Sequence, residues 1–240
     1  MKTAYDFEKT RNLSLKRYLI NLNKKLDYIK YAIKSDYEYG FGSSLPFFEG
    51  ELSNIESCTL VLEDRFFFVH HGIELRAVPR LIRRYLRTGH FGGISTIEQQ
   101  AIRTVLNKRE RTLGRKFQEL TLAYCLNFHC AKRMILRYYL NNAYFGYALR
   151  GCDEASLHIF GKQASALDHE QAAFIASLLP RPLPRAMFIA LGKRATPPSD
   201  PHEIISEAKK IGLQWAENIE LRYSYALALQ RSSPSNRLIR

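Results

Sequence analysis

The sequence has no apolar stretch long enough to cross a membrane, for which about 18 consecutive residues are needed. Residues 1–11 are polar and charged, without the apolar segment that a signal peptide requires. We therefore expect neither a transmembrane helix nor a signal peptide in these residues. Alternating strand patterns are also scarce, and no internal repeat is visible, which disfavours sheet-rich and solenoid folds.

Cysteine is rare, and the four cysteines form no Cys-x-x-Cys pair. Cys125 and Cys130 flank His129, an arrangement that a metal ion could in principle use. Isolated buried thiols on helices are the simpler interpretation. We therefore expect no metal site built from protein side chains, and the thiols favour a reducing compartment.

Positive charge, in contrast, is abundant, with a formal net charge of +13 on 240 residues. Such a charge predicts an anionic partner, and nucleic acid, anionic lipid and a pyrophosphate-bearing substrate all qualify. No nucleic-acid-binding fold signature is present, so we expect no nucleic-acid partner. The hydrophobic content of 46% is that of a globular protein.

Helical periodicity dominates the chain. Leucine and isoleucine recur at spacings of three and four over residues 12–35, which predicts a helix. This helix packs on the core or a partner, or it lies on a membrane surface. Residues 36–50 favour a loop, and an almost wholly helical core is expected over residues 53–184. Its clearest segments are Leu120–Asn127, Met134–Leu140 and Glu170–Leu179.

The chain divides on this basis into three parts. Residues 1–52 form an N-terminal helix and loop extension, and residues 53–192 form the main domain. The proline-rich residues 193–201 predict a linker, followed by one helix from about 202 to 230. The third part, 193–240, is therefore a linker with a C-terminal helix.

Four sequence blocks carry the functional information. The first is Glu-Asp-x-x-Phe-x-x-His-x-Gly over residues 63–72, and the second is Gly-Ile-Ser-Thr-Ile-Glu-Gln-Gln over 93–100. Arg-Lys-Phe-Gln-Glu over 115–119 and Lys-Arg-Met-Ile-Leu-Arg-Tyr-Tyr-Leu-Asn over 132–141 follow. In this order and spacing, the blocks resemble the peptidoglycan glycosyltransferases of glycosyltransferase family 51. The resemblance implies a mainly α fold, with a lysozyme-like helical lobe and a smaller membrane-facing lobe.

The resemblance also implies a reaction. The 4-hydroxyl of one lipid-linked disaccharide attacks the anomeric carbon of another, and polyprenyl pyrophosphate leaves. Glu63 matches the family's catalytic glutamate, and the nearby phenylalanines suit a general base with a raised pKa. The alternative is that Glu63 and Asp64 begin a helix and complement its dipole. We expect Asp64 to orient neighbouring groups in the substrate site.

The second block supplies hydrogen-bonding side chains for sugar hydroxyls or pyrophosphate oxygens. The predicted substrate-binding residues here are Ser95, Thr96, Gln99, Gln100 and Arg103. Gln99 and Arg103 are four residues apart and so share a helical face. Arg103 stands where the family usually has lysine, which keeps the charge but changes its geometry.

Glu98 departs further from the family, which usually has threonine or serine at this position. A carboxylate beside a pyrophosphate site repels the substrate unless it faces away or pairs with a cation. Glu98, Arg103 and the missing anchor favour a second hypothesis, a weakened or inactive family member that binds lipid-linked precursor or a cell-wall partner.

In the third block, Arg111, Arg115 and Glu119 are spaced by four and predict one helical face. The alternative is a solvated face of charges without function. By resemblance, Arg111 and Lys116 contact the donor pyrophosphate, and Glu119 is the second essential carboxylate. A divalent cation, Mg²⁺ or Mn²⁺, is expected to assist the leaving group, although no aspartate cluster marks its site.

Residues 76–87 predict a basic amphipathic helix. Its apolar stripe is Val78, Leu81, Ile82 and Tyr85, and five of the other positions are arginines. Such a helix suits an anionic membrane interface, and the corresponding family segment dips into the bilayer. An ordinary solvated helix is the alternative.

The sequence therefore predicts a peptidoglycan glycosyltransferase that polymerises lipid II. Its expected partners are lipid II, the growing glycan strand, the membrane surface and other cell-wall synthesis proteins. Its expected place is the membrane periphery, on the outer face by resemblance. A glycoside hydrolase is also conceivable on a lysozyme-like fold, but the donors and cations fit pyrophosphate departure better than attack by water.

Overall fold

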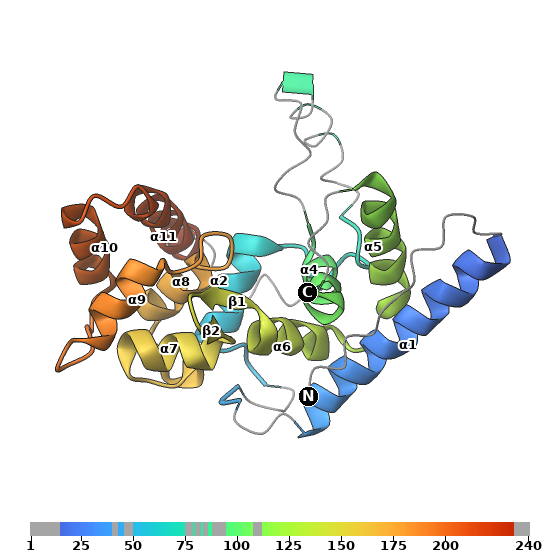
Figure 1. Ribbon diagram of the computed structural model, residues 1–240, viewed down its shortest axis with the longest axis horizontal. Coiled ribbons are helices and arrows are strands. Elements are labelled where there is room, and N and C mark those ends of the chain that lie inside the picture. The colour runs from blue at the N-terminus through green and yellow to red at the C-terminus, as the bar shows by residue number, and fades with distance from the viewer. Residues whose placement is uncertain are drawn as a thin grey trace.

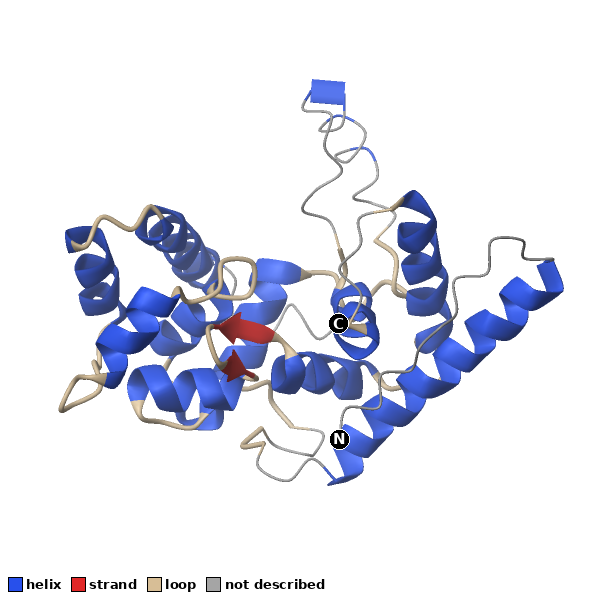
Figure 2. Cartoon of the chain, in the orientation of Figure 1, coloured by secondary structure: helices blue, strands red, loops and turns tan. Residues whose placement is uncertain are grey.

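The computed structural model describes residues 15–39, 43–45, 50–74, 79, 83, 86–87, 95–107 and 112–232. These residues form helices and one short sheet (Figures 1 and 2). The helices are α1 Leu15–Tyr39, α2 Asn54–Glu63, α4 Ile97–Leu106, α5 Leu113–Leu126, α6 Lys132–Asn142, α7 Cys152–Phe160, α8 His169–Ser177, α9 Arg185–Gly192, α10 Pro201–Lys210 and α11 Trp215–Ser232, with a 3₁₀ turn at Ala164–Ala166. The predicted mainly α, lysozyme-like fold class is confirmed.

The two strands, β1 Tyr144–Gly146 and β2 Leu149–Arg150, form an antiparallel pair directly after α6. On one side of the molecule lie α1, α4, α5 and α6, and on the other lie α7 to α11 (Figure 1). Between them runs α2, which packs on α8 and α11. The site described below lies where α2 ends and α4 begins.

The helix α2 places the first block. Ser53 caps its start, and a capping box with Glu56 satisfies the exposed backbone donors. Glu63 is its last residue and Asp64 is its C-cap. The alternative that these acids begin a helix is therefore wrong. A carboxylate at a helix C-terminus meets the negative end of the dipole, so α2 does not account for an acid at position 63.

The turn at Gly72, which follows α2 in the chain, contacts α5 and the start of α4. Gly72 has a φ of +78°, and a Cβ at this position would lie 2.4 Å from the carbonyl oxygen of Ala123 on α5. Only glycine fits so close to another backbone. The carbonyl oxygen of Gly72 in turn accepts a hydrogen bond from Thr96 Oγ1 at 2.9 Å, and Thr96 is the N-cap of α4.

The helix α1 packs on α5 and α6. Leu22, Leu26, Ile29 and Ile33 are buried in the core, whereas Leu19 is about half exposed at 49%. Core packing therefore accounts for the apolar residues of the predicted helix from Leu22 onward. The helix continues to Tyr39, four residues beyond the predicted end at 35, so the predicted loop begins later than expected.

The predicted single helix from about 202 to 230 is wrong, because two helices occupy this region. Asp200 caps α10 by accepting from the backbone N–H of His202, and Pro201 occupies its first turn. Gly212, with a φ of +72°, follows the C-terminal residues of α10 in the left-handed conformation that favours glycine. The chain then turns and begins α11 at Trp215.

A fully buried stripe fixes α11 to the rest of the molecule. The stripe consists of Ala216, Ile219, Tyr223 and Ala226, at helical spacings of three and four. The ring of Tyr223 lies edge-on to Phe174 of α8, with 6.4 Å between ring centroids. This helix is therefore part of the core.

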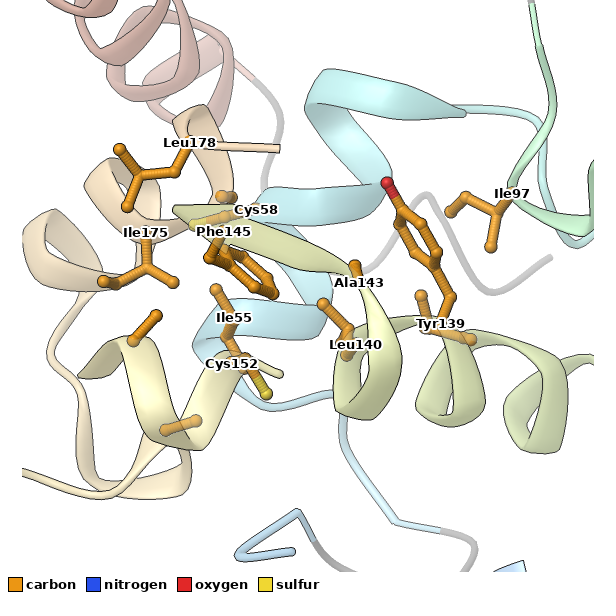
Figure 3. Packing of buried hydrophobic residues seen from close by; sticks show 14 of the residues in the cluster. Ile55, Cys58, Ile97, Tyr139, Leu140, Ala143, Phe145, Cys152, Ile175 and Leu178 are labelled. Carbon is orange, nitrogen blue, oxygen red and sulfur yellow. The ribbon is translucent and has the colours of Figure 1, made fainter. Parts of the chain in front are cut away.

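The core continues through the junction of the two sides (Figure 3). Cys58 and Cys152 lie within it as buried free thiols, and burial raises the pKa of the Cys152 thiol well above its usual range. Among the described residues, Cys125, His129 and Cys130 do not bring their ligand atoms together as a metal site. These cysteines are therefore packing residues.

Candidate active site

Glu63 lies at the end of α2 with its side chain 12% exposed. Its Oε2 accepts a hydrogen bond from Gln100 Nε2 of α4 at 3.0 Å. Its Oε1 forms an ion pair with Arg222 of α11. The candidate base is thus held on one side by an amide and on the other by a cation.

Gln100 is itself held in one orientation. Its Oε1 accepts a hydrogen bond from the hydroxyl of Tyr139 at 2.6 Å, so its amide nitrogen must face Glu63. Burial, chiefly, and the nearby Glu63 raise the pKa of the Tyr139 phenol well above its usual value. The phenol therefore stays protonated and donates. Figure 3 shows Tyr139 extending from α6, with its hydroxyl oxygen at the end away from the helix.

A cavity of about 240 Å³ opens beside this group. Its lining residues are Gln100, Arg103, Thr104, Tyr139, Ala143, Tyr144, Leu179 and Pro182. Gln100 and Tyr139 therefore belong both to the wall of the cavity and to the chain of hydrogen bonds that ends at Glu63. Arg103, one helical turn further along α4, lines the same cavity and also contacts the second carboxylate, Glu119.

Glu119 occupies a different environment on α5, with its side chain only 4% exposed. Its Oε1 lies 3.0 Å from Arg103 Nε and 2.5 Å from Arg115 Nη1. Lys116 Nζ lies 3.6 Å from its Oε2. Three cations therefore surround one buried acid, and the cluster carries excess positive charge. The alternative of a solvated charge face does not describe Glu119.

Lys116 is hydrogen-bonded to side chains of the second block. Its Nζ donates to Gln99 Oε1 at 2.5 Å and to Ser95 Oγ at 3.0 Å. Arg103 also donates to Ser95 Oγ, at 3.3 Å. Burial lowers the pKa of the Lys116 ammonium below its usual value, and Glu119 opposes this shift. An anion placed beside the cluster would gain from this excess of cationic donors.

Glu98 faces away from that cluster. It is fully buried and forms an ion pair with Lys132 of α6. Lys132 Nζ also donates to the carbonyl oxygen of His70 at 2.7 Å and lies 4.5 Å from the ring centroid of Phe67. Glu98 thus pairs with a cation inside the protein, the condition under which it is not expected to repel an anionic substrate.

Asp64 and Thr96 are structural connectors in this geometry. Asp64 is 5% exposed, and its oxygens accept from His70 Nε2 at 2.9 Å and from the backbone N–H of Ile97 at 3.1 Å. Thr96 is buried at the start of α4. The contact of Asp64 and Thr96 with substrate stays a prediction. The hydrogen bonds of Asp64 support its predicted orienting role. Arg111 lies outside the described residues.

Asp64, His70 and Glu98 bring their ligand atoms within 4.8 Å of one another. They do not fit a divalent cation, because both ring nitrogens of His70 are engaged. Nδ1 accepts from the backbone N–H of Gly72 at 3.1 Å, and the ammonium of Lys132 already neutralises Glu98. Glu98 Oε2 has no hydrogen-bond partner among the described residues. The expected Mg²⁺ or Mn²⁺ therefore has no site here.

Sequence reasoning missed Tyr139, Lys132 and Arg222. Tyr139 and Lys132 lie in the fourth block, which we interpreted as mainly architectural. Their polar atoms could have been questioned, because a buried hydroxyl or ammonium requires a partner. Arg222 carried no signal at all, since it follows Glu63 by 159 residues on a helix outside the four blocks.

The fold and the site together define a mainly α protein with two distinct carboxylates. One lies beside a cavity and the other beneath a cluster of cations. Sequence comparison assigns it more closely: the chain belongs to the Transglycosylase family, whose model matches residues 52–195.

The chain is similar to three relatives from different bacteria. It is 36% identical to penicillin-binding protein 2a of Streptococcus pneumoniae serotype 2 over 129 residues, which cover 54% of this chain and 17% of the relative. It is 36% identical to a biosynthetic peptidoglycan transglycosylase of Alcanivorax borkumensis, covering 53% of each. A protein of the same name from Acinetobacter baumannii strain SDF is 35% identical, with 54% of this chain and 58% of the relative covered. The match thus spans little more than half of these two transglycosylases.

Proposed function

We propose that this protein is a peptidoglycan glycosyltransferase that polymerises lipid II into glycan strands. The observation that carries the proposal is that two residues of one cavity wall contact the two carboxylates, Gln100 contacting Glu63 and Arg103 contacting Glu119. The names of the similar proteins support the same reaction. Lipid II and the growing glycan strand are the substrates in this proposal.

In this mechanism, Glu63 acts as the general base. It accepts the proton of the acceptor's 4-hydroxyl as that oxygen forms a bond with the anomeric carbon of the donor. The bond from that carbon to the pyrophosphate breaks, and polyprenyl pyrophosphate leaves with the electron pair. Gln100 keeps one oxygen of Glu63 in place, and it also lines the cavity in which we place the reacting sugars.

The cations around Glu119 stabilise the leaving group. Arg103 lines the cavity and contacts Glu119, so it links the sugar site to the charge cluster. Glu119 is almost fully buried. Its negative charge holds Arg103, Arg115 and Lys116 together despite their mutual repulsion. Donors fixed in advance of the reaction stabilise developing charge without reorganisation.

The alternative of an inactive precursor-binding relative loses its main support. It rested on Glu98 and Arg103 as departures from the family. Glu98 is buried against Lys132, and Arg103 contacts the second carboxylate through its Nε, a donor that lysine lacks. Both departures are thus accommodated by the surrounding residues.

Membrane attachment at the periphery is part of the proposal. No helix among the described residues is both long and apolar enough to span a bilayer. Phe117 and Tyr124 of α5 are exposed, as is Phe128 in the turn that follows it, and these aromatic side chains suit a lipid interface. Most of the predicted membrane helix 76–87 lies outside the described residues. The outer face of the membrane remains the expectation drawn from the resemblance.

Vesicle binding tests this attachment. Replacing Leu81 and Ile82 by serine should weaken co-sedimentation with anionic vesicles even at low salt. Replacing Arg83 and Arg84 by glutamine should weaken it on anionic vesicles only, and added salt should mask the difference. Unchanged binding by both double variants would remove residues 76–87 as the contact.

Incubation with labelled lipid II tests the activity directly. The purified protein should produce glycan polymer, resolved by gel electrophoresis, in the presence of detergent or lipid. Parallel reactions with EDTA, and with Mg²⁺ or Mn²⁺ restored, show whether a divalent cation is required. Absence of polymer under all conditions, with lipid II still bound, would instead establish the non-catalytic alternative.

A further inference from the structure

The C-terminal helix α11 meets the end of α2 at two points. Arg222 forms the ion pair with Glu63, and the hydroxyl of Tyr225, one turn further, accepts a hydrogen bond from Arg65. The guanidinium of Arg65 also lies 5.4 Å from the ring centroid of Tyr225. These contacts join a helix outside the family match, which ends at residue 195, to the residue proposed as the base.

The helix is not free to move away from these contacts as a lid would. Next to Arg222 along the same helix runs the buried stripe of Ala216, Ile219, Tyr223 and Ala226. Arg65 is in addition anchored to α2, since its Nε donates to the carbonyl oxygen of Val61 at 3.2 Å. Arg222 is therefore presented to Glu63 by a rigid support.

Electrostatics explain why a cation is needed there. Glu63 is the last residue of α2, whose last turn contains no basic residue. A largely buried carboxylate at a helix C-terminus lies against the negative end of the dipole. Among the described residues, Arg222 is the cation within ion-pair distance of Glu63. It compensates both the carboxylate and the exposed carbonyl groups of the helix end.

The pair also fixes the orientation of the carboxylate. The terminal torsion of a glutamate is broad, so a carboxylate with one partner can still rotate. Glu63 has a partner on each oxygen, Gln100 on Oε2 and Arg222 on Oε1. With both in place, the carboxylate plane is set relative to the cavity that Gln100 lines.

We propose that Arg222 is a positioning residue of the active site and that α11 is an integral part of it. Arg222 holds Glu63 in the orientation from which it accepts the proton of the attacking hydroxyl. This inference rests on the proposed function, because it assigns Arg222 a part in the same reaction.

Steady-state polymerisation of lipid II by the full chain tests the inference. R222Q should lower kcat by about 10²-fold, the loss typical of a misplaced reacting group, while KM changes by less than about threefold. R222K should recover part of the loss, since it restores the charge without the planar fork. The matched control is R194Q. Arg194 is also partly buried and ion-paired, with Glu203 and Glu207, and lies away from the site. Its removal should leave kcat unchanged.

Chemical rescue distinguishes a positioning role of Arg222 from a purely structural one. Guanidinium chloride at millimolar concentration, far below denaturing levels, should restore activity to R222A. Sodium chloride at the same ionic strength should not, and guanidinium should not raise the activity of the parent. A structural role for Arg222 would be seen as a lower melting temperature without rescue. Where R222Q or R222A does not fold, the kcat of R222K decides.

The outcomes distinguish the two proposals. A parent protein that does not polymerise lipid II overturns the proposed function and this inference together. A parent that polymerises, with R222Q as active as R194Q, overturns the inference alone. Loss of activity in R222Q through KM only, or without rescue of R222A by guanidinium, also overturns it.

Discussion

The two carboxylates of the site are the same residue type in opposite settings. Glu63 ends a helix, accepts a hydrogen bond from Gln100 of the cavity wall and has one cation on one of its oxygens. Glu119 lies in mid-helix, almost fully buried, with three cations around it. In our proposal Glu63, which contacts a residue of the cavity wall, exchanges a proton with the substrate. In the same proposal Glu119 organises charge, because three cations lie around its carboxylate and only one contacts Glu63.

The difference shows that the identity of a residue does not determine its chemistry. Motif matching assigned a catalytic role to both acids, since both match acids of the family. Only their surroundings separate a base from a charge organiser. The predictions below test this separation, because each variant should disturb one carboxylate environment and spare the other.

Glu63→Gln should have the largest effect on catalysis. It removes the base but nearly preserves shape, so polymerisation should fall by about 10²–10⁴-fold with the melting temperature close to that of the parent. The rate is measured on labelled lipid II. Glu207→Gln, which removes an acid paired with Arg194, serves as the control and should stay active. Near-normal turnover by the Glu63 variant would end its assignment as the base.

Glu119→Gln should affect binding and stability together. Without its charge, Arg103, Arg115 and Lys116 repel one another, and the free energy of unfolding should fall by about 1–3 kcal/mol. Because the displaced cations no longer stabilise the leaving group well, kcat/KM should fall by roughly 10–100-fold. Thermal or denaturant unfolding and lipid II kinetics measure the two effects. A variant as stable as the parent would contradict the organising role.

Lys116 should set the alkaline limit of activity. Its ammonium is needed to hold an anion, and burial lowers its pKa, so its charge is lost at a lower pH than for an ordinary lysine. The kcat/KM profile, which reports groups of the free enzyme, should therefore decline on the alkaline side. In Lys116→Arg the charge persists and this decline should move to higher pH. Lys209→Arg, at an ion pair with Glu220 remote from the site, should leave the profile unchanged.

Glu98→Thr should have the smallest effect on catalysis. Since Glu98 neutralises Lys132 away from the cation cluster, the rate per folded molecule should stay within about twofold of the parent. The free energy of unfolding should fall by about 1–3 kcal/mol, because Lys132 loses its buried partner. Changing Lys132 to methionine in the same chain should return part of the stability. A clear gain in lipid II affinity would mean that Glu98 does repel the substrate.

Much of the fold could be predicted because its signals are local. Apolar spacing located α5, α6 and α8, and the resemblance of the four blocks to the family suggested Glu63, Gln99 and Lys116 as site residues. The break between α10 and α11 was missed because a glycine in an amphipathic segment also occurs within helices. The alternative in which Glu63 begins a helix had the wrong helix end, since helix boundaries depend on caps such as Ser53 and Asp64.

The partners of the site residues could not be predicted. That Arg222 contacts Glu63 depends on how α11 packs on α8, which is a property of the three-dimensional core. The neutralisation of Glu98 by Lys132 likewise joins α4 to α6 over 34 positions of sequence. A single sequence reports which charged groups exist, but not which of them pair.

The side chain of Gln99 connects the backbone turn at Gly72 with Lys116. Its Nε2 donates to the carbonyl oxygen of Gly72 at 3.1 Å, while its Oε1 accepts from Lys116 Nζ at 2.5 Å. A free lysine side chain loses up to about 2 kcal/mol of conformational entropy when it is immobilised. Here the immobilisation accompanies folding, so an arriving anion meets an ammonium that is already ordered. The turn at Gly72, which touches no substrate in our proposal, thereby lowers the entropic penalty of binding one.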